Sequence, residues 1–297
     1  MRMGLNEIDC FQIKQLIQVR EVFAITKIEP YKGIAGIYEE IRPSYPEQLI
    51  QDIISVTNLK SEDILLEIGA GTGKATIQFA NKGFRIHAIE IGEDMAVILR
   101  KKCSAYTNVT IDVASFEEWT CREGLAYDMI YSAQAFHWIN KDIKYRRCHE
   151  LLKDNGYLVL FWYQPTGCKT PERIEIDDQV DMLVRRYTSN VTTIKEGSER
   201  LAHTGVASDE DRKKEIDESG LFRIVSELNY TDKTRNNPEQ YLKVMKSVPS
   251  YASVLDGIDS DIIKKMDREI EELINQHGGY TEEEFLYSLY IAQKIVR

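Results

Sequence analysis

Residues 63–76 read D-I-L-L-E-I-G-A-G-T-G-K-A-T, an apolar run followed by three alternating glycines. A short apolar run of this kind is typical of a buried parallel strand. Gly69, Gly71 and Gly73 allow backbone angles that are closed to other residues, and they let the main chain approach a ligand more closely than a Cβ permits. The stretch therefore predicts a ligand-binding turn at the end of a strand. A glycine-rich turn that holds no ligand is the alternative.

The spacing of the glycines argues against two other nucleotide-binding motifs. A dinucleotide fingerprint G-x-G-x-x-G beginning at Gly69 would need glycine at position 74, where the chain has Lys74. A phosphate loop ending at Gly73-Lys74 would need glycine at 68 and a hydroxyl residue at 75, where the chain has Ile68 and Ala75. An NAD-dependent oxidoreductase is therefore disfavoured, and a phosphate loop is excluded.

The pattern E-x-G-x-G-x-G, from Glu67 to Gly73, resembles motif I of class I S-adenosylmethionine-dependent methyltransferases. The second half of that signature is an acidic residue at the end of the next strand, and R-I-H-A-I-E ends at Glu90. A carboxylate at this place can accept hydrogen bonds from both ribose hydroxyls of a nucleoside. The resemblance implies that S-adenosyl-L-methionine is the cofactor and that Glu90 holds its ribose.

Two further stretches are similar to the small-molecule branch that includes trans-aconitate methyltransferases. They are Y-E-E-I-R-P-S-Y-P, residues 38–46, and A-Q-A-F-H-W, residues 133–138. The resemblance implies that the first stretch folds across the cofactor, so that Tyr38 or Arg42 contacts its methionine end, and that the second faces the transferring methyl. Arg42 could equally be a surface cation, because exposed arginines are common.

Carried over residue by residue, the resemblance assigns cofactor contacts to the ends of several strands. Met95 matches a position that packs on adenine, although it would also serve as core filler. The end of the strand at 109–115 is expected to bracket the adenine as well. The cofactor-binding candidates are Tyr38, Arg42, Glu67, Gly69, Ala70, Gly71, Gly73, Glu90, Ile91, Met95, Ser115, Phe116, Ser132, Ala133 and Gln134.

The remaining candidates concern catalysis and contact with the methyl acceptor. The candidate catalytic residue is His137, since imidazole titrates near neutral pH, but a histidine that only fixes the loop is the alternative. Transfer to a carboxylate needs no general base, because alignment supplies most of the rate. The resemblance favours a small carboxylic acid as acceptor. The substrate-contact candidates are His137, Trp138, Tyr163 and Tyr251, and the cations that could pair with an acid are Arg42, Arg146, Arg147 and Lys169.

The composition is that of an ordinary globular protein. The 297 residues are 43% hydrophobic and 29% charged, with a formal net charge of -10. A nucleic-acid partner normally requires a basic face, so none is expected. The five cysteines are scattered without a C-x-x-C pair, so no metal site is expected. With neither a leader nor an apolar run of ~20 residues, we expect a cytoplasmic monomer or homodimer without a membrane partner.

Strand-like and helix-like segments alternate from residue 63 onward, which predicts a doubly wound α/β sheet. The resemblance adds a Rossmann-like class I methyltransferase sheet, seven-stranded and mostly parallel, with an antiparallel last strand. A capping-box pattern at Ser44 and Glu47 marks a helix start. Strands are expected at 63–68, 85–91, 109–115, 127–133, 157–163, 222–230 and 285–292. Further helices are expected at 74–82, 93–103, 143–153, from 170 onward, at 238–246 and at 261–276.

The predicted organisation has three parts. Residues 1–35 form an N-terminal helical extension, with a helix within 5–27. Residues 36–165 and 221–297 form the S-adenosylmethionine-binding core. Residues 166–220 form a helical lid insertion over the acceptor pocket, with the charged run 209–218 as its solvated face.

These patterns together indicate an enzyme that transfers methyl from S-adenosylmethionine to a small-molecule acceptor, by O-methylation of a carboxylic acid. The alternative from another functional class is a non-enzymatic S-adenosylmethionine-binding or regulatory protein, which would keep the cofactor site without acceptor chemistry.

Overall fold

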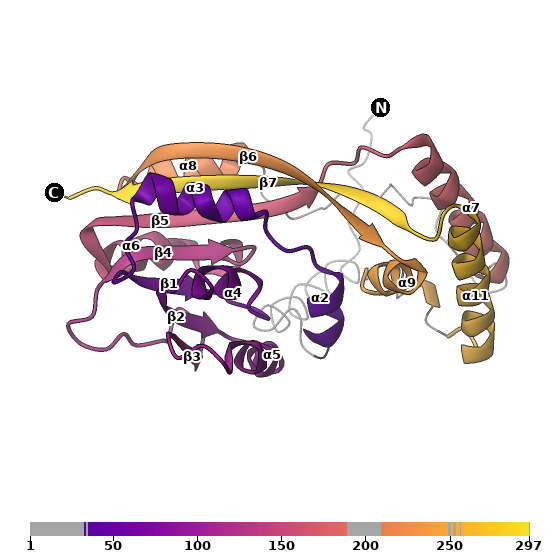
Figure 1. Ribbon diagram of the computed structural model, residues 1–297, viewed down its shortest axis with the longest axis horizontal. Coiled ribbons are helices and arrows are strands. Elements are labelled where there is room, and N and C mark those ends of the chain that lie inside the picture. The colour runs from indigo at the N-terminus through magenta and orange to yellow at the C-terminus, as the bar shows by residue number, and fades with distance from the viewer. Residues whose placement is uncertain are drawn as a thin grey trace, which may run out of the picture.

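Seven strands form one mixed sheet in the order β3-β2-β1-β4-β5-β7-β6 (Figure 1). β1 to β5 pair in parallel, and β7 runs antiparallel to both β5 and β6. The predicted doubly wound, mostly parallel sheet with an antiparallel last strand is therefore confirmed. The strands are β1 (Ile64–Ile68), β2 (Arg85–Glu90), β3 (Val109–Val113), β4 (Tyr127–Ala133), β5 (Leu152–Pro165), β6 (Phe222–Asn236) and β7 (Thr281–Lys294).

The computed structural model describes residues 33, 35–188, 209–248, 251, 254, 255 and 257–296. The helix predicted within residues 5–27, and nearly all of the predicted extension 1–35, lies outside these residues. Residues 189–208 of the predicted lid 166–220 also lie outside them. The division of the chain into core, extension and lid stays a prediction.

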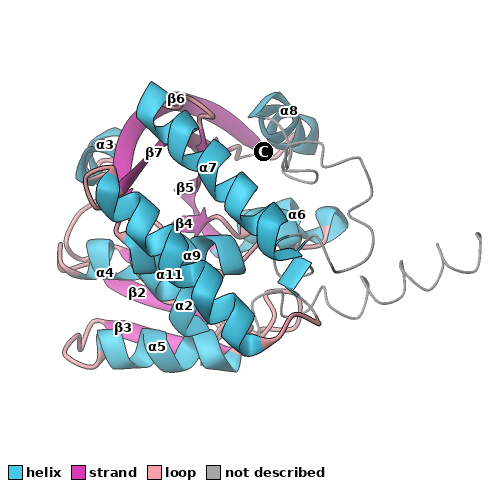
Figure 2. Ribbon diagram, turned by 90° about the vertical axis from the view of Figure 1, so that its right-hand side faces the viewer, coloured by secondary structure: helices cyan, strands magenta, loops and turns pink. Residues whose placement is uncertain are grey.

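Helices cover both faces of the sheet, with α3 and α4 on one side and α6 and α8 on the other (Figure 2). No helix within the described ranges combines the length and the apolar character that a bilayer crossing requires. The helices are α2 (Ala35–Ile41), α3 (Glu47–Thr57), α4 (Lys74–Ala80), α5 (Glu93–Cys103), the 3-10 turn η1 (Phe136–Trp138), α6 (Lys141–Leu151), α7 (Pro171–Thr188), α8 (Asp209–Ser219), α9 (Pro238–Lys246) and α11 (Ser260–Gln276).

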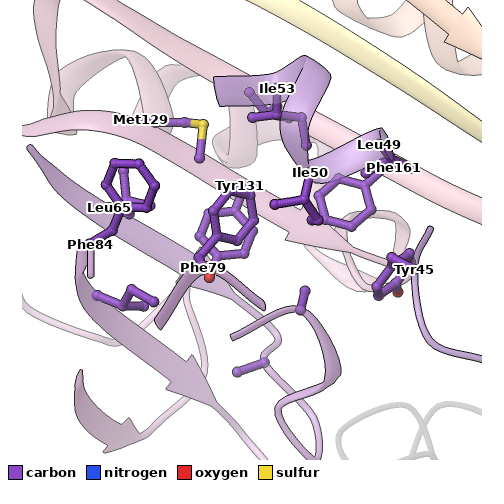
Figure 3. Close-up of a cluster of buried hydrophobic side chains, with 14 of the residues drawn as sticks. Tyr45, Leu49, Ile50, Ile53, Leu65, Phe79, Phe84, Met129, Tyr131 and Phe161 are labelled. Carbon is purple, nitrogen blue, oxygen red and sulfur yellow. The ribbon is translucent and has the colours of Figure 1, made fainter. Parts of the chain in front are cut away.

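Each face of the sheet has its own hydrophobic core, because successive side chains of a strand point to opposite faces. On β4, Tyr131 belongs to the core under α3 and α4, whereas Ile130 belongs to the core under α6 and α8. Figure 3 shows the first core, in which the ring centroids of Phe79 and Tyr131 lie 4.7 Å apart. The central strands β1 and β4 are thus buried on both faces, which accounts for their largely apolar sequences.

A third cluster lies beyond the main part of the sheet, where β6 and β7 extend past their neighbours (Figure 1). Ile176 and Val180 of α7 pack there against apolar side chains of α9 and α11. The predicted helix beginning near Thr170-Pro171 is confirmed as α7, which starts at Pro171. Whether α7 covers an acceptor pocket stays a prediction.

The capping box predicted at Ser44 and Glu47 is wrong. α3 begins at Glu47 with Pro46 at its N-cap, and no side chain caps it. Proline disfavours the helical conformation in the residue before it, so Tyr45 cannot continue a helix that begins at Ser44. The Ser44 carbonyl instead accepts a hydrogen bond of 3.1 Å from the Tyr287 hydroxyl on β7.

Most of the described charged side chains in the run 209–218 are exposed, and the place of this run in a lid stays a prediction. The run forms α8, which packs beside β6 and β7, and Ile216 in it is fully buried in the same core as Trp162 and Tyr290. The buried Ile216 side chain holds this helix on the sheet, together with the contact between Arg212 and Trp162 and the bond from Lys144 to Glu215. β6 also runs to Asn236, further than predicted, because it pairs with β7 along its length.

Replacing Phe79 by alanine is expected to lower the free energy of unfolding by about 3–5 kcal/mol, because the fully buried ring would leave a cavity. Val97→Ala on α5 is the control, since the Val97 side chain is exposed. Urea unfolding followed by circular dichroism measures both variants. Similar losses in the two would contradict the packing of Phe79 between α4 and the sheet.

Candidate functional site

The glycine turn is fixed to the neighbouring strand by main-chain hydrogen bonds. The amides of Gly69 and Ala70 both donate to the Ile89 carbonyl, at 2.9 and 3.0 Å. Gly69, Gly71 and Gly73 all have positive φ, at 71°, 57° and 84°. The turn thus joins the carboxyl ends of β1 and β2, the edge at which open parallel sheets bind ligands.

The three glycines have different surroundings. A Cβ on Gly69 would lie 2.3 Å from the Ala135 Cβ, and one on Gly73 would lie 2.5 Å from the Leu99 side chain. A Cβ on Gly71 would meet nothing within 4 Å. Gly69 and Gly73 are therefore required by packing, whereas Gly71 faces open space that a ligand can approach closely.

Glu90 lies at the centre of this edge. Its Oε2 accepts a hydrogen bond of 2.6 Å from the Gly71 amide, and its Oε1 accepts one of 2.8 Å from the Gly92 amide. Burial raises the pKa of this carboxyl, although the amide donors oppose the shift. Each oxygen keeps a further acceptor position, so a carboxylate fixed in this way can also bind hydroxyl groups.

Glu67 is buried deeper, inside the sheet. Its Oε2 accepts hydrogen bonds from the Thr76 hydroxyl at 2.5 Å and the Tyr131 hydroxyl at 2.9 Å. Burial raises its pKa from 4.5 to about 8. These bonds connect β1, α4 and β4, so Glu67 helps to hold in place the strand and the helix that flank the glycine turn. Its contact with a cofactor stays a prediction.

The helix α2 is fastened to the glycine turn by Lys74, the residue that breaks the dinucleotide fingerprint. The Lys74 ammonium donates to the Glu39 carbonyl at 2.8 Å, and the Lys102 ammonium donates to the Glu39 carboxylate at 2.7 Å. The same helix carries Tyr38, and the Arg42 guanidinium lies 5.4 Å from the centre of its ring. The buried Arg42 Nε has no hydrogen-bond partner among the residues that the structure describes.

The predicted adenine-side residues follow β2 and β3 in the chain, at the same edge of the sheet, and their contact with a cofactor stays a prediction. Met95 at the start of α5 and Phe116 after β3 are both buried, and Ile91 and Ser115 are half-buried. The Arg147 guanidinium lies 5.1 Å from the centre of the Phe116 ring, so Arg147 already has a partner within the protein.

The loop after β4 reaches the same edge through specific contacts. The Ser132 hydroxyl donates to the Ile68 carbonyl at 2.7 Å, and the Gln134 side-chain amide donates to the Tyr163 carbonyl at 2.8 Å. Gln134 has a φ of 61°, which is rare for a residue other than glycine and recurs at functional sites. Ala133 is the last residue of β4 and pairs with Phe161.

His137 and Trp138 follow in the turn η1, with their side chains exposed and their rings 4.9 Å apart. Nearby protein atoms hinder hydration of the charged ring, and together with the cations Arg212 and Lys144 they lower the pKa of His137 to about 4. The His137 ring makes no hydrogen bond to any part of the chain that the structure describes, so the loop-fixing alternative gains no support.

The remaining acceptor-side candidates are dispersed. Tyr163 is buried beside Tyr45 and Tyr287 in the core. Tyr251 packs against the third cluster with α7, α9 and α11, and its buried hydroxyl has no hydrogen bond to the described part of the chain. Lys169 pairs with Asp177 at 2.5 Å, and Arg146 lies near Glu150 on the surface of α6.

Two cations that act electrostatically on His137 are absent from the predicted set. They are Arg212 of α8 and Lys144 of α6, which are both buried. Arg212 stands in the run D-E-D-R-K-K-E, in which nothing in the sequence separates an inward cation from its exposed neighbours. His/Cys/Asp/Glu clusters able to hold a metal ion do not occur among the described residues.

Comparison with known proteins finds relatives of the part of the chain that contains the glycine turn and its neighbouring strands. Residues 65–156 match a family model described as a methyltransferase domain. An uncharacterised methyltransferase-like protein of Schizosaccharomyces pombe is 30% identical over 141 residues, which cover 46% of this chain and 52% of that protein. A protein of Saccharomyces cerevisiae named as a probable S-adenosylmethionine-dependent methyltransferase is 27% identical over 143 residues, covering 47% and 49%.

A solved structure from Anaeromyxobacter dehalogenans, described as a type II methyltransferase, has a TM-score of 0.55 and 18% identity, covering 85% of this chain and 97% of that one. At this identity the similarity supports the fold alone. The chain spans about half the length of the curated relatives it matches.

Gly69→Ala is expected to destabilise the protein much more than Gly83→Ala. Both positions have positive φ, which costs an alanine about 1–2 kcal/mol, but only at position 69 would the new methyl overlap Ala135. Thermal unfolding midpoints of the two variants test this difference. Equal midpoints would show that the loop after β4 does not lie against the turn.

Glu67→Gln is expected to gain stability relative to the wild type as the pH rises from about 5 to about 8. Folded Glu67, with its pKa raised to about 8, keeps a proton that the unfolded chain releases near 4.5, so wild-type stability falls across this window. Glutamine has no such proton, and the relative gain should be about 1 kcal/mol or more. Urea titrations at both pH values measure it.

The control for this pH effect is Glu118→Gln, because Glu118 is exposed. Its stability relative to the wild type should stay nearly constant between the two pH values. If Glu67→Gln behaved in the same way, the Glu67 carboxyl would have to be ionised in the folded protein.

Proposed function

We propose that this protein, which carries an S-adenosylmethionine-dependent methyltransferase domain, transfers the methyl group of that cofactor to a small-molecule acceptor. We further propose that the acceptor is a small carboxylic acid methylated on oxygen. The matched methyltransferase model supports the reaction class. The resemblance of residues 38–46 and 133–138 to trans-aconitate methyltransferases supports the acceptor class.

The observation that carries the proposal is the arrangement of Glu90 beside Gly71. The carboxylate is oriented by the Gly71 and Gly92 amides, at the one glycine of the turn whose missing Cβ leaves open space. A nucleoside requires an acceptor for its two ribose hydroxyls and close approach to the main chain, and these residues provide both. The residues present therefore fit the cofactor.

Other residues of the edge are assigned by their position. The methionine side of the cofactor is proposed to lie against the turn formed by Gly69, Ala70 and Gly73. Tyr38, on α2, and Arg42, just after α2, are proposed to lie on its other side. The unpartnered Arg42 Nε supports a contact with an anionic group such as the methionine carboxylate. The residues proposed for the adenine side are Met95, Ile91, Ser115 and Phe116.

When bound, the cofactor supplies an electrophilic methyl group on a sulfonium. A carboxylate acceptor is already a nucleophile, so the protein has only to align it and exclude water. With a pKa of about 4, His137 is a weak base at neutral pH. We therefore assign His137 and Trp138 to contact with the acceptor and propose no obligatory proton transfer to His137.

S-adenosylhomocysteine, the product, is expected to bind the wild type with a dissociation constant in the micromolar range, about -8 kcal/mol. Glu90→Ala and Gly71→Ala should each weaken binding at least about tenfold, because one removes the ribose acceptor and the other fills the open space. Gly83→Ala, which also has positive φ but lies outside the edge, should bind as the wild type does. Isothermal titration calorimetry measures all four proteins.

Transfer itself is tested with radiolabelled S-adenosylmethionine and a panel of small di- and tricarboxylic acids, trans-aconitate included. Formation of a labelled, base-labile ester supports O-methylation of a carboxylic acid. Label in an amine panel but not in the acids would make the acceptor class wrong. Tight product binding without label in any acceptor would favour a binding protein that lacks acceptor chemistry.

A further inference from the structure

A buried cation lies on an aromatic ring next to the acceptor edge. The Arg212 guanidinium, on the first turns of α8, lies 4.3 Å from the centre of the Trp162 ring on β5. Only 6% of Arg212 and 3% of Trp162 are exposed to solvent. Burial of an arginine is costly and is seldom found without a specific electrostatic role.

This pair lies at the carboxyl end of the parallel strands, where the methyl group has to be delivered. Trp162 follows Phe161, which pairs with Ala133 at the end of β4, and the Gln134 amide donates to the carbonyl of the next residue, Tyr163. Arg212 is also near enough to His137 to disfavour its protonation. The pair therefore borders the stretch assigned to the acceptor.

A second buried cation reinforces the positive field at this place. Lys144 of α6 is 2% exposed, donates to Glu215 of α8 at 2.6 Å, and lies 4.9 Å from the centre of the Phe136 ring. Like Arg212, it disfavours a positive charge on His137. An anion placed beside His137 would be stabilised by both cations.

The Trp162 indole provides an independent indication. Its Nε1–H is buried and has no hydrogen-bond acceptor among the residues that the structure describes. A buried donor without a partner loses the hydrogen bonds it makes to water, and such groups recur where a ligand completes the hydrogen bonding. The cation and the unpaired donor belong to contacting side chains.

We propose that Arg212 and Trp162 form a binding site for an oxyanion of the acceptor, a carboxylate or a phosphate, that is not itself methylated. Arg212 contributes charge-assisted hydrogen bonds, Trp162 donates from Nε1, and Lys144 adds to the field. The acceptor would then carry two functional groups, one held by this pair and one presented to the methyl. This inference rests on the proposed function, because it names the anchor of the acceptor at that site.

The test uses the Trp162 indole as its own reporter. The chain has three tryptophans, so its indole N–H signals in a ¹H–¹⁵N spectrum can be assigned by single Trp→Phe variants. The full-length protein is saturated with S-adenosylhomocysteine and titrated with tricarballylate, and separately with inorganic phosphate. The Trp162 signal should shift saturably in the millimolar range or below. Trp119 donates to Asp112 at 2.7 Å, so its signal should not move.

Arg212→Gln should weaken this titration about tenfold or more, since it removes the charge while keeping a polar side chain. Lys213→Gln is the matched control, because Lys213 is the next residue of α8 but is exposed and pairs with Glu227. Trp162→Phe keeps an aromatic ring under Arg212 but removes the N–H, together with some buried volume. Calorimetric affinity for tricarballylate should fall in this variant as well, which provides a second readout if Arg212→Gln does not fold.

The two oxyanions distinguish the chemical source of the anchor. Tighter binding of tricarballylate indicates a polycarboxylic acceptor, and tighter binding of phosphate indicates a phosphorylated one. A Trp162 signal that neither anion moves, or that moves equally in Arg212→Gln, overturns the inference. If this happens while S-adenosylhomocysteine still binds, the proposed function stands and only the anchor is wrong. Failure to bind S-adenosylhomocysteine would instead remove the proposed function.

Discussion

The site depends on one buried carboxylate that bridges two turns. Glu90 ends β2, and its two oxygens accept from the Gly71 amide in the first turn and the Gly92 amide in the second. This arrangement fixes the distance between the ends of β1 and β2, and it holds the carboxylate in place before any ligand arrives. Such preorganisation reduces the ordering cost of binding. The remainder of the edge is built around this fixed carboxylate.

A second carboxylate, Glu67, serves a different purpose one strand away. It lies within the sheet, where Thr76 and Tyr131 donate to it, and burial favours its protonated form. Burial raises the pKa of Glu90 as well, but there the main-chain amides of Gly71 and Gly92 oppose the shift. The two acids of the sequence signature are thus separated by their surroundings, one joining secondary-structure elements and the other facing the ligand edge.

Much of the sheet could be predicted because its signals are local. Alternating strands and helices, glycines at the turn and Glu90 at the end of β2 all follow from patterns of a few residues. The loop after β4 was located by the same kind of pattern, although the positive φ of Gln134 was not. Local signals fail when two of them compete, as at Ser44, where the rule for a capping box and the restriction imposed by Pro46 lead to different helix starts.

Features that depend on contacts between distant parts of the chain were less predictable from the sequence. Arg212 looks like any other charge in its run, and only the packing of α8 through Ile216 turns it toward Trp162. The extension of β6 to Asn236 depends on β7, which is distant in sequence. Likewise, the cations Arg147 and Lys169 have suitable chemistry for an acid, but Phe116 and Asp177 already engage them. Such contacts are decided by the tertiary structure.

The bond between the Tyr287 hydroxyl and the Ser44 carbonyl has a consequence for the order in which the protein matures during synthesis. Ser44 belongs to the segment that leads from α2 to α3, whereas Tyr287 lies in the last strand, which inserts between β5 and β6. The Tyr230 hydroxyl on β6 likewise donates a hydrogen bond to Asp52 of α3, which attaches that helix to the sheet. A nascent chain that has emerged only as far as β5 already contains the glycine turn and Glu90, but it lacks both fastenings. The segment from α2 to α3 therefore acquires both supports only after β6 and β7 have emerged from the ribosome.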